Sequence, residues 1–291
     1  MKKILTLAAI FGGFVSSAYA ANISVVAAEN QYGSVAEMIG GDKVDVTSII
    51  SNADGDPHTF VSSVKNSKIL ENADVIVYNG ADYDTWINPI IKNNKNAKAI
   101  SAQDLVNFKA KGGFGINPHL WYNPQTFPAV AERLEAVFSE LDPADKAYFE
   151  ANLKDFKEKY APVYKLIDTT KEQYEDTPVT ATEPLYGYMA TALNLDMMGL
   201  NFQWVIMNDS EPTPKMMIDY QNLFKEKKVK VLFYNEQVTD NVTKNILALA
   251  KQNDVEIVGL TETMPQDKNA ISWMIDTLEE TQQALEKANS K

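Results

Sequence analysis

The two histidines of this 291-residue chain occupy matching local settings. His58 lies in "DPHTF" and His119 lies in "NPHLWYNP", so each histidine follows a proline within a polar, turn-rich stretch. Neutral imidazole is the commonest metal ligand in proteins. A single histidine is more simply explained as a surface residue with a satisfied hydrogen bond, but the repeated setting favours a shared role in binding a metal ion.

Two glutamates are the candidate partners of these histidines. Glu183 directly follows the apolar run 179–182, and Glu262 follows the run 256–260. Both runs are typical of β-strands, and ligands of open α/β sheets gather at the carboxyl ends of the strands. Two nitrogens from the first half of the chain and two carboxylates from the second half would enclose one divalent cation. The alternative interpretation of each glutamate is a solvated loop acid or a charge at a helix N-terminus.

The elements that must position these residues alternate along the chain. Segments with helical spacing separate six short apolar runs that are expected to be strands: 23–28, 44–50, 75–78, 179–182, 229–234 and 256–260. Strands that alternate with helices indicate α/β units and a mainly parallel sheet. Because the pattern occurs twice, we predict an α/β fold of two lobes with mainly parallel sheets.

Residues 143–175 predict one long helix between the lobes. Asp142 is a favourable N-cap and Pro143 suits the first helical position. An apolar stripe recurs every three or four residues: Phe149, Leu153, Phe156, Tyr160, Val163 and Ile167. Pro162 interrupts the pattern and is expected to kink the helix. A single helix of this length predicts a stiff connection.

Residues 1–20 have the features of a secretory signal peptide. A positively charged start precedes an apolar run that is too short to span a bilayer, and Ala18, Tyr19 and Ala20 form a small-x-small cleavage pattern. The remaining chain is then expected to comprise an N-terminal α/β lobe, a linker helix and a C-terminal α/β lobe over 21–142, 143–175 and 176–291. We expect an exported, periplasmic protein.

Composition narrows the possible partners. The chain has no cysteine, which a bacterial lipoprotein needs for its lipid, so we expect a freely diffusing monomer without a membrane anchor. The net charge is −12, and removal of the leader with its two lysines makes it more negative by two. An acidic protein of this kind is unsuited to nucleic acid or to an anionic membrane surface, and it attracts cations.

Several segments, in this order, carry a resemblance to a known family: "GGDKVDV", "DPHTF", "ENADVIVYNGADYDTWI", "NPHLWYNP", "TEPLYGYM" and "EPTPK". Together they resemble the zinc- and manganese-binding (TroA-like) receptors of bacterial ABC importers. The resemblance covers essentially the whole chain after residue 20. It implies two α/β lobes joined by one long helix, with a single metal ion between the lobes. It also implies delivery of that ion to an ABC permease, which works with an ATPase.

The resemblance also implies roles for particular residues. The implied metal ligands are two histidines and two glutamates: His58, His119, Glu183 and Glu262. Glu183 stands where the family places His or Glu, whereas Glu262 stands where the family supplies Asp. Asn123 is expected to orient a histidine. Asn235 or Glu236, at the end of a predicted strand, is expected to join the hydrogen-bond network of the site.

The implied donor set bears on the choice of metal. Two nitrogens and two carboxylates form a harder site than the three-histidine set of zinc receptors, which favours Mn²⁺ or Fe²⁺. Zn²⁺ stays possible because the intrinsic affinity order favours it over both. The leading hypothesis is a binding protein and not an enzyme. The alternatives are a glycosidase-like enzyme with Glu183 and Glu262 as its carboxyl pair, and an adhesin-type surface protein.

Overall fold

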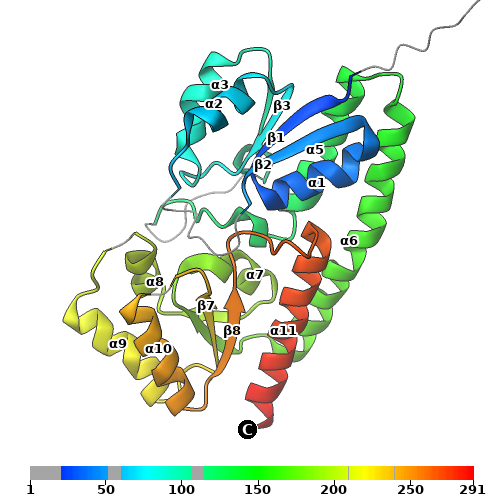
Figure 1. Cartoon of the computed structure of the whole chain (residues 1–291). Coiled ribbons are helices and arrows are strands. Elements are labelled where there is room, and N and C mark those ends of the chain that lie inside the picture. Colours follow the sequence, from blue (N-terminus) through cyan, green and yellow to red (C-terminus); the bar gives the residue numbers. More distant parts are fainter. Residues whose placement is uncertain (1–20, 52–59, 107–113, 209, 239) are drawn as a thin grey trace, which may run out of the picture.

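The computed structural model describes residues 21–51, 60–106, 114–208, 210–238 and 240–291. The predicted signal peptide and His58 lie outside the described residues. Figure 1 shows two lobes, one above the other, with one long helix running along both. The predicted α/β fold of two lobes is confirmed.

The first lobe is built on a four-stranded parallel sheet in the order β2-β1-β3-β4. Its strands are β1 (Ile23–Glu29), β2 (Val44–Ile50), β3 (Val75–Tyr78) and β4 (Lys98–Ser101). In the described part of this lobe the helices are α1 (Asn30–Gly40), α2 (Val64–Glu71), α3 (Asn88–Asn93), α4 (Ala102–Val106) and α5 (Thr126–Leu141). The run "VIVY" forms β3 because its first three side chains are fully buried, as strands covered on both faces require.

The second lobe repeats this arrangement with a parallel sheet in the order β6-β5-β7-β8. Its strands are β5 (Pro178–Ala181), β6 (Asp196–Met198), β7 (Val231–Asn235) and β8 (Glu256–Leu260). Its helices are α7 (Gly187–Ala192), α8 (Leu200–Met207), α9 (Pro214–Lys225), α10 (Asn241–Gln252) and α11 (Ala270–Ser290). In both sheets the strand order reverses beside the first strand, which is where ligands of open α/β sheets bind.

Side-chain caps set the start of several helices. Thr213 accepts a hydrogen bond from Met216 N at the start of α9, and Asp240 accepts two at the start of α10. Asn269 and Ser272 form a reciprocal capping box at the start of α11. These bonds satisfy backbone N–H groups that a helix leaves unpaired at its first turn.

The linker helix is α6 (Lys146–Tyr174), which continues through Pro162. It begins later than Asp142 and Pro143 predicted. The Asp142 side chain instead accepts a hydrogen bond from Ala144 N at 3.2 Å, so the chain makes a turn before the helix starts. The buried stripe of α6 agrees with the apolar spacing, except that Leu153 is only partly buried.

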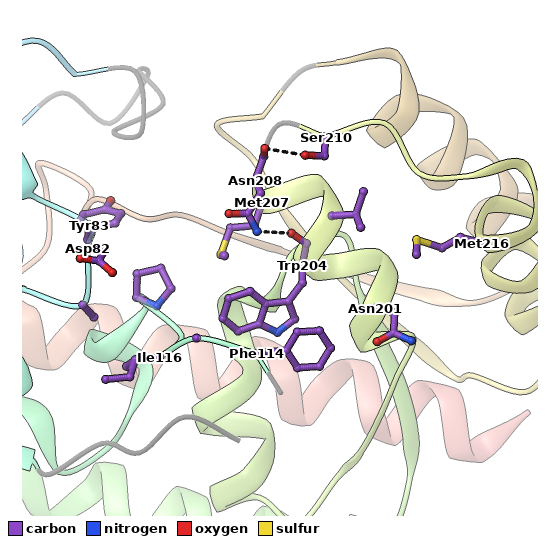
Figure 2. A pocket seen from close by; sticks show the side chains of 14 residues that line it. Asp82, Tyr83, Phe114, Ile116, Asn201, Trp204, Met207, Asn208, Ser210 and Met216 are labelled. Carbon is purple, nitrogen blue, oxygen red and sulfur yellow. Dashed lines mark hydrogen bonds between the residues drawn. The ribbon is translucent and has the colours of Figure 1, made fainter. Parts of the chain in front are cut away.

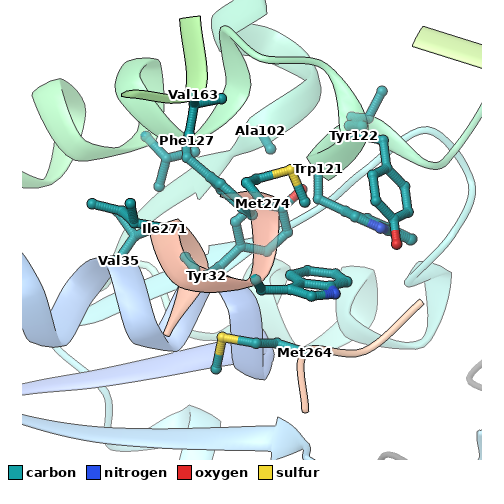
Figure 3. Packing of buried hydrophobic residues seen from close by; sticks show 14 of the residues in the cluster. Tyr32, Val35, Ala102, Trp121, Tyr122, Phe127, Val163, Met264, Ile271 and Met274 are labelled. Carbon is teal, nitrogen blue, oxygen red and sulfur yellow. The ribbon is translucent and has the colours of Figure 1, made fainter. Parts of the chain in front are cut away.

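One hydrophobic core runs through both lobes. Helix α6 packs on α1 and α5 of the first lobe and on α11 of the second lobe. Figure 3 shows Val35, Phe127, Val163 and Met274, one from each of these four helices, in the same cluster. A shared core makes the lobes one packed unit and holds their facing edges close together.

Candidate metal centre

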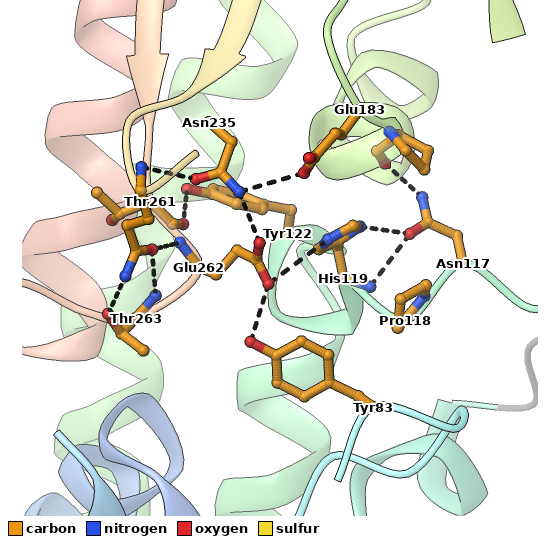
Figure 4. Close-up of polar contacts among 12 residues, drawn as sticks. Tyr83, Asn117, Pro118, His119, Tyr122, Glu183, Asn235, Thr261, Glu262 and Thr263 are labelled. Carbon is orange, nitrogen blue, oxygen red and sulfur yellow. Dashed lines mark hydrogen bonds and ion pairs between the residues drawn. The ribbon is translucent and has the colours of Figure 1, made fainter. Parts of the chain in front are cut away.

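Three of the predicted ligands meet between the lobes. Glu183 lies two residues beyond the end of β5, and Glu262 lies two residues beyond the end of β8. His119 reaches them from the first lobe, in the segment before a short 3-10 turn over Leu120–Tyr122. Figure 4 shows the three side chains pointing toward one another from different elements.

The geometry of this cluster fits one cation. His119, Glu183 and Glu262 each offer a donor atom, and these atoms all lie within 4.8 Å of one another. His119 Nε2 lies 3.8 Å from Glu262 Oε2. Metal–ligand bonds of about 2.1 Å place donor atoms between roughly 3 and 4 Å apart around a shared ion. All three side chains are buried, which shields a bound ion from water.

Asn235 connects the two carboxylates. It is the last residue of β7 and is fully buried. Its Nδ2 donates to Glu262 Oε1 at 2.6 Å and to Glu183 Oε2 at 3.2 Å. Two buried negative charges repel each other in a medium of low dielectric constant, so a shared donor between them stabilises the cluster.

Asn117 orients the histidine. Its Oδ1 accepts from His119 N at 3.1 Å and lies 2.7 Å from His119 Nδ1. Because Oδ1 is an acceptor, this pairing assigns the ring proton to Nδ1 and leaves the lone pair of Nε2 facing the carboxylates. Asn117 Nδ2 also donates to Pro184 O at 2.5 Å, next to Glu183. One asparagine therefore couples the histidine to the second lobe.

Tyr83 supports Glu262 from the first lobe. Its hydroxyl donates to Glu262 Oε2 at 2.9 Å, the same oxygen that faces the histidine. Burial, followed by the charge of Glu262, holds the pKa of Tyr83 well above its usual value. The hydroxyl therefore keeps its proton and remains a donor.

The loop that presents Tyr83 has an unusual backbone. Three consecutive residues have positive φ angles of 77°, 55° and 61°: Gly80, Ala81 and Asp82. This conformation is unfavourable for the two that are not glycine. Asp84 holds the loop by accepting from Asn79 N at 2.6 Å and from Gly80 N at 2.9 Å.

A buried acid pair lies behind this loop. Both carboxyl oxygens of Glu29 are buried without a conventional donor, and its carboxyl interacts with Asp84. Burial, and then the charge of Asp84, holds the pKa of Glu29 well above its usual value. Burial also raises the pKa of Asp84 to about 6. A neutral Glu29 that donates its proton to Asp84 satisfies both groups.

Gln237 holds the backbone N–H groups of Glu262, a predicted ligand, and of the residue that follows it. Its Oε1 accepts from Glu262 N at 2.5 Å and from Thr263 N at 3.3 Å. Its Nε2 donates to Thr263 Oγ1 at 2.9 Å. Gln237, Asn117 and Tyr83 were not among the residues singled out in the sequence. Their positions next to a predicted ligand or beyond a strand end were the only available signals.

The remaining predicted site residues have different positions. Asn235 contacts the cluster, whereas Glu236 is exposed and accepts a hydrogen bond from Tyr234 at 3.2 Å. The expectation that Asn123 orients a histidine stays a prediction. The Asn123 side chain accepts from Gln125 N at 2.9 Å, because it closes a turn before α5.

A cavity of about 630 Å³ borders the cluster. Its lining includes Tyr83 and Pro118 of the first lobe and Trp204 and Met207 of α8. Figure 2 shows Tyr83 across the space from Trp204 and Met207. Tyr83 donates to Glu262, and Pro118 directly precedes His119. The cavity therefore lies between the lobes beside the ligand cluster.

Known proteins resemble this chain over most of its length. The manganese ABC transporter substrate-binding lipoprotein PsaA of Streptococcus mitis is 26% identical over 260 residues, which cover 84% of this chain and 82% of the relative. The metal ABC transporter substrate-binding lipoprotein SsaB of Streptococcus sanguinis is 27% identical over 247 residues, which cover 79% of this chain and 78% of that relative.

A solved structure extends the likeness to the fold. The periplasmic zinc-binding protein TroA of Treponema pallidum has a TM-score of 0.76 at 16% identity, covering 91% of this chain and 99% of its own. The model of the family described as zinc-uptake complex component A, periplasmic, matches residues 25–284. The match includes both lobes, the linker helix and the three clustered side chains, so this chain belongs to the zinc-uptake complex component A family.

Proposed function

We propose that this protein captures one divalent transition metal ion between its lobes and delivers it to an ABC permease, which an ATPase drives. The observation that carries the proposal is the buried cluster of His119, Glu183 and Glu262, whose donor atoms lie within 4.8 Å of one another. His58 is the proposed fourth ligand. A site supplied by both lobes suits a receptor because it encloses the ion, and small shifts of the packed lobes with rearrangement of the loops at Glu183 and Glu262 would open it.

The donor set supports Mn²⁺ or Fe²⁺ as the preferred ion. Glu183 and Glu262 supply hard oxygen atoms, and the described part of the chain supplies one imidazole to the cluster. Carboxylates suit Mn²⁺ better than imidazole-rich sites do, whereas the general affinity order still permits Zn²⁺. The relative named as a manganese receptor supports the same assignment.

We further propose that the protein acts in the periplasm as a monomer without a lipid anchor. The named relatives are lipoproteins, but this sequence has no cysteine to carry a lipid. Among the residues that the structure describes, no helix is long and apolar enough to cross a membrane. The permease and its ATPase are the proposed partners, and a net charge of −12 is unsuited to binding nucleic acid.

A binding role is preferred to a glycosidase role. Both glutamate side chains are buried, with residue exposures of 5% for Glu183 and 0% for Glu262, and they share the amide of Asn235. A glycosidase needs its two carboxyl groups on either side of a sugar, with access for water. Among the described residues, no contact of the site favours the alternative of an adhesin-type surface protein.

Equilibrium titration of the metal-free protein tests the proposal. One tight site per chain is expected for Mn²⁺ and for Zn²⁺, and His119→Ala or Glu262→Gln should weaken binding by at least about a hundredfold. Glu236→Gln is the matched control, since it removes an exposed carboxylate near the site and should change affinity less than threefold. Two tight sites, no site, or equal effects of Glu262→Gln and Glu236→Gln would refute the assignment.

A further inference from the structure

The first turn of α1 contacts the metal-binding segment of the opposite lobe. Asn30 Nδ2 donates to Met264 O at 2.6 Å, and Met264 N donates to Asn30 Oδ1 at 3.0 Å. Gln31 Nε2 donates to the backbone oxygen of Glu262 at 3.2 Å. We call these contacts of Asn30 and Gln31 with residues 262–264 the interlobe clasp.

The clasp is buried, which makes its hydrogen bonds costly to break. Asn30 is 8% exposed, Gln31 is 0% exposed and Met264 is 7% exposed. An unpaired backbone group in such surroundings loses about 1–3 kcal/mol relative to a paired one. One turn later, Ser34 Oγ accepts from Ala270 N at 3.1 Å, so α1 also holds the start of α11.

The clasp acts on one ligand in particular. Glu262 belongs to the second lobe, where Asn235 and Gln237 hold its carboxylate and its backbone N–H. Its backbone oxygen is held from the first lobe by Gln31. Residues 262–264 therefore cannot move away from the first lobe until the contacts of Asn30 and Gln31 have broken.

We propose that Asn30 and Gln31 are positioning residues that keep Glu262 on the metal and set the rate at which the metal leaves. This proposal rests on the proposed function, because it assigns Glu262 as a ligand. Loss of the clasp lets residues 262–264 move away from the first lobe, so dissociation accelerates. Capture is affected less, because the hydrogen bonds described for His119 and Glu183 join them to Asn117 and Asn235.

The test measures metal release from Mn²⁺-loaded protein after mixing with excess EDTA. Trp121 is a natural reporter, because its ring lies edge-on to the His119 ring with centroids 5.4 Å apart. Leucine has the same number and branching of side-chain heavy atoms as asparagine, so Asn30→Leu keeps the branched shape and removes both hydrogen bonds to Met264. It should raise the dissociation rate at least tenfold and change the association rate less than threefold. Gln31→Met removes the single bond to Glu262 and should give a smaller increase.

Asn152→Ala is the matched control. Asn152 Nδ2 donates to Ile39 O at 2.9 Å, which joins α6 to the far end of α1, away from the metal cluster. Its loss should lower the melting temperature but leave metal release unchanged. If the clasp only stabilises the fold, Asn30→Leu should likewise lower the melting temperature and leave metal release unchanged.

A double-mutant cycle separates the clasp from general stability. If Asn30 acts through Glu262, then Asn30→Leu should no longer accelerate release in a Glu262→Gln background. Wild-type release rates in Asn30→Leu and Gln31→Met would refute the proposed role of the clasp but not the proposed function. The same conclusion would follow if the effects of Asn30→Leu and Glu262→Gln on the release rate were fully additive. A wild-type protein that binds no metal would overturn the proposed function as well. If Asn30→Leu fails to fold, Gln31→Met gives the deciding rate.

Discussion

Removal of the Tyr83 hydroxyl is the sharpest test of how the site holds its acidic ligand. The Tyr83→Phe substitution keeps the ring and deletes the 2.9 Å hydrogen bond to Glu262 Oε2. A hydrogen bond to a charged group contributes about 1.5–3 kcal/mol. Since about 1.4 kcal/mol corresponds to tenfold in affinity, this bond alone predicts roughly 10- to 100-fold weaker metal binding. Loss of a partner that orients a metal ligand usually has an effect of the same size, about 10- to 100-fold.

Tyr122→Phe is a matched control for this effect. The Tyr122 hydroxyl donates to Thr261 O at 2.8 Å, one residue before the ligand, and does not touch the carboxylate in the described contacts. Both substitutions should reduce stability, but Tyr122→Phe should change metal affinity less than threefold. Competition with a fluorescent chelator measures both dissociation constants, and thermal unfolding of the metal-free proteins measures stability. Wild-type affinity in Tyr83→Phe, or equal losses in the two variants, would refute the role of Tyr83.

Three other substitutions test the surroundings of the site. Glu183→His should shift the ratio of the Mn²⁺ and Zn²⁺ dissociation constants in favour of Zn²⁺ by at least about tenfold, because imidazole is the softer donor. Glu183→Gln is the control, and an unchanged ratio in Glu183→His would place Glu183 outside the ligand set. Asn235→Leu leaves two buried carboxylates without their shared donor, so the metal-free protein should lose about 3 kcal/mol of unfolding free energy in urea, and wild-type stability would contradict the bridging role. Glu29 and Asp84 have raised pKa values, so the folded state holds more protons than the unfolded state, and stability should fall as pH rises from about 4 through about 6 and above. Glu29→Gln should flatten this fall in melting temperature between pH 5 and pH 8, and parallel curves for the two proteins would count against the shared proton.

Local sequence predicted the sheets where each strand was long enough to show its apolar character. The runs at 23–28, 75–78 and 256–260 all form strands, because mainly apolar runs between helices are buried in the central sheets. Two strands were missed, β4 (Lys98–Ser101) and β6 (Asp196–Met198). Each is a short edge strand whose residues have a mixed character, so its conformation comes from pairing with β3 or β5.

The sequence by itself determined the chemistry of the candidate site. The chain has two histidines, and two glutamates follow predicted strands, so the residue types and the strand ends pointed to His58, His119, Glu183 and Glu262, of which His58 lies outside the described residues. The expectation that Asn235 or Glu236 joins the hydrogen-bond network came from the family resemblance, and Asn235 is the one that contacts the cluster. Glu183 and Glu262 lie together because parallel strands bring their carboxyl ends to one edge, and His119 meets them from the first lobe.

Tertiary structure alone decided how those ligands are held. Tyr83 lies 179 residues from Glu262, and Asn30 lies 234 residues from Met264, yet each pair is joined by a hydrogen bond. Local sequence does not predict such partners, because a tyrosine or an asparagine in a turn has the same local sequence pattern whether its side chain contacts water or a distant residue. The contacts appear only when the shared core brings the facing edges of the two lobes together, where buried polar groups must find partners.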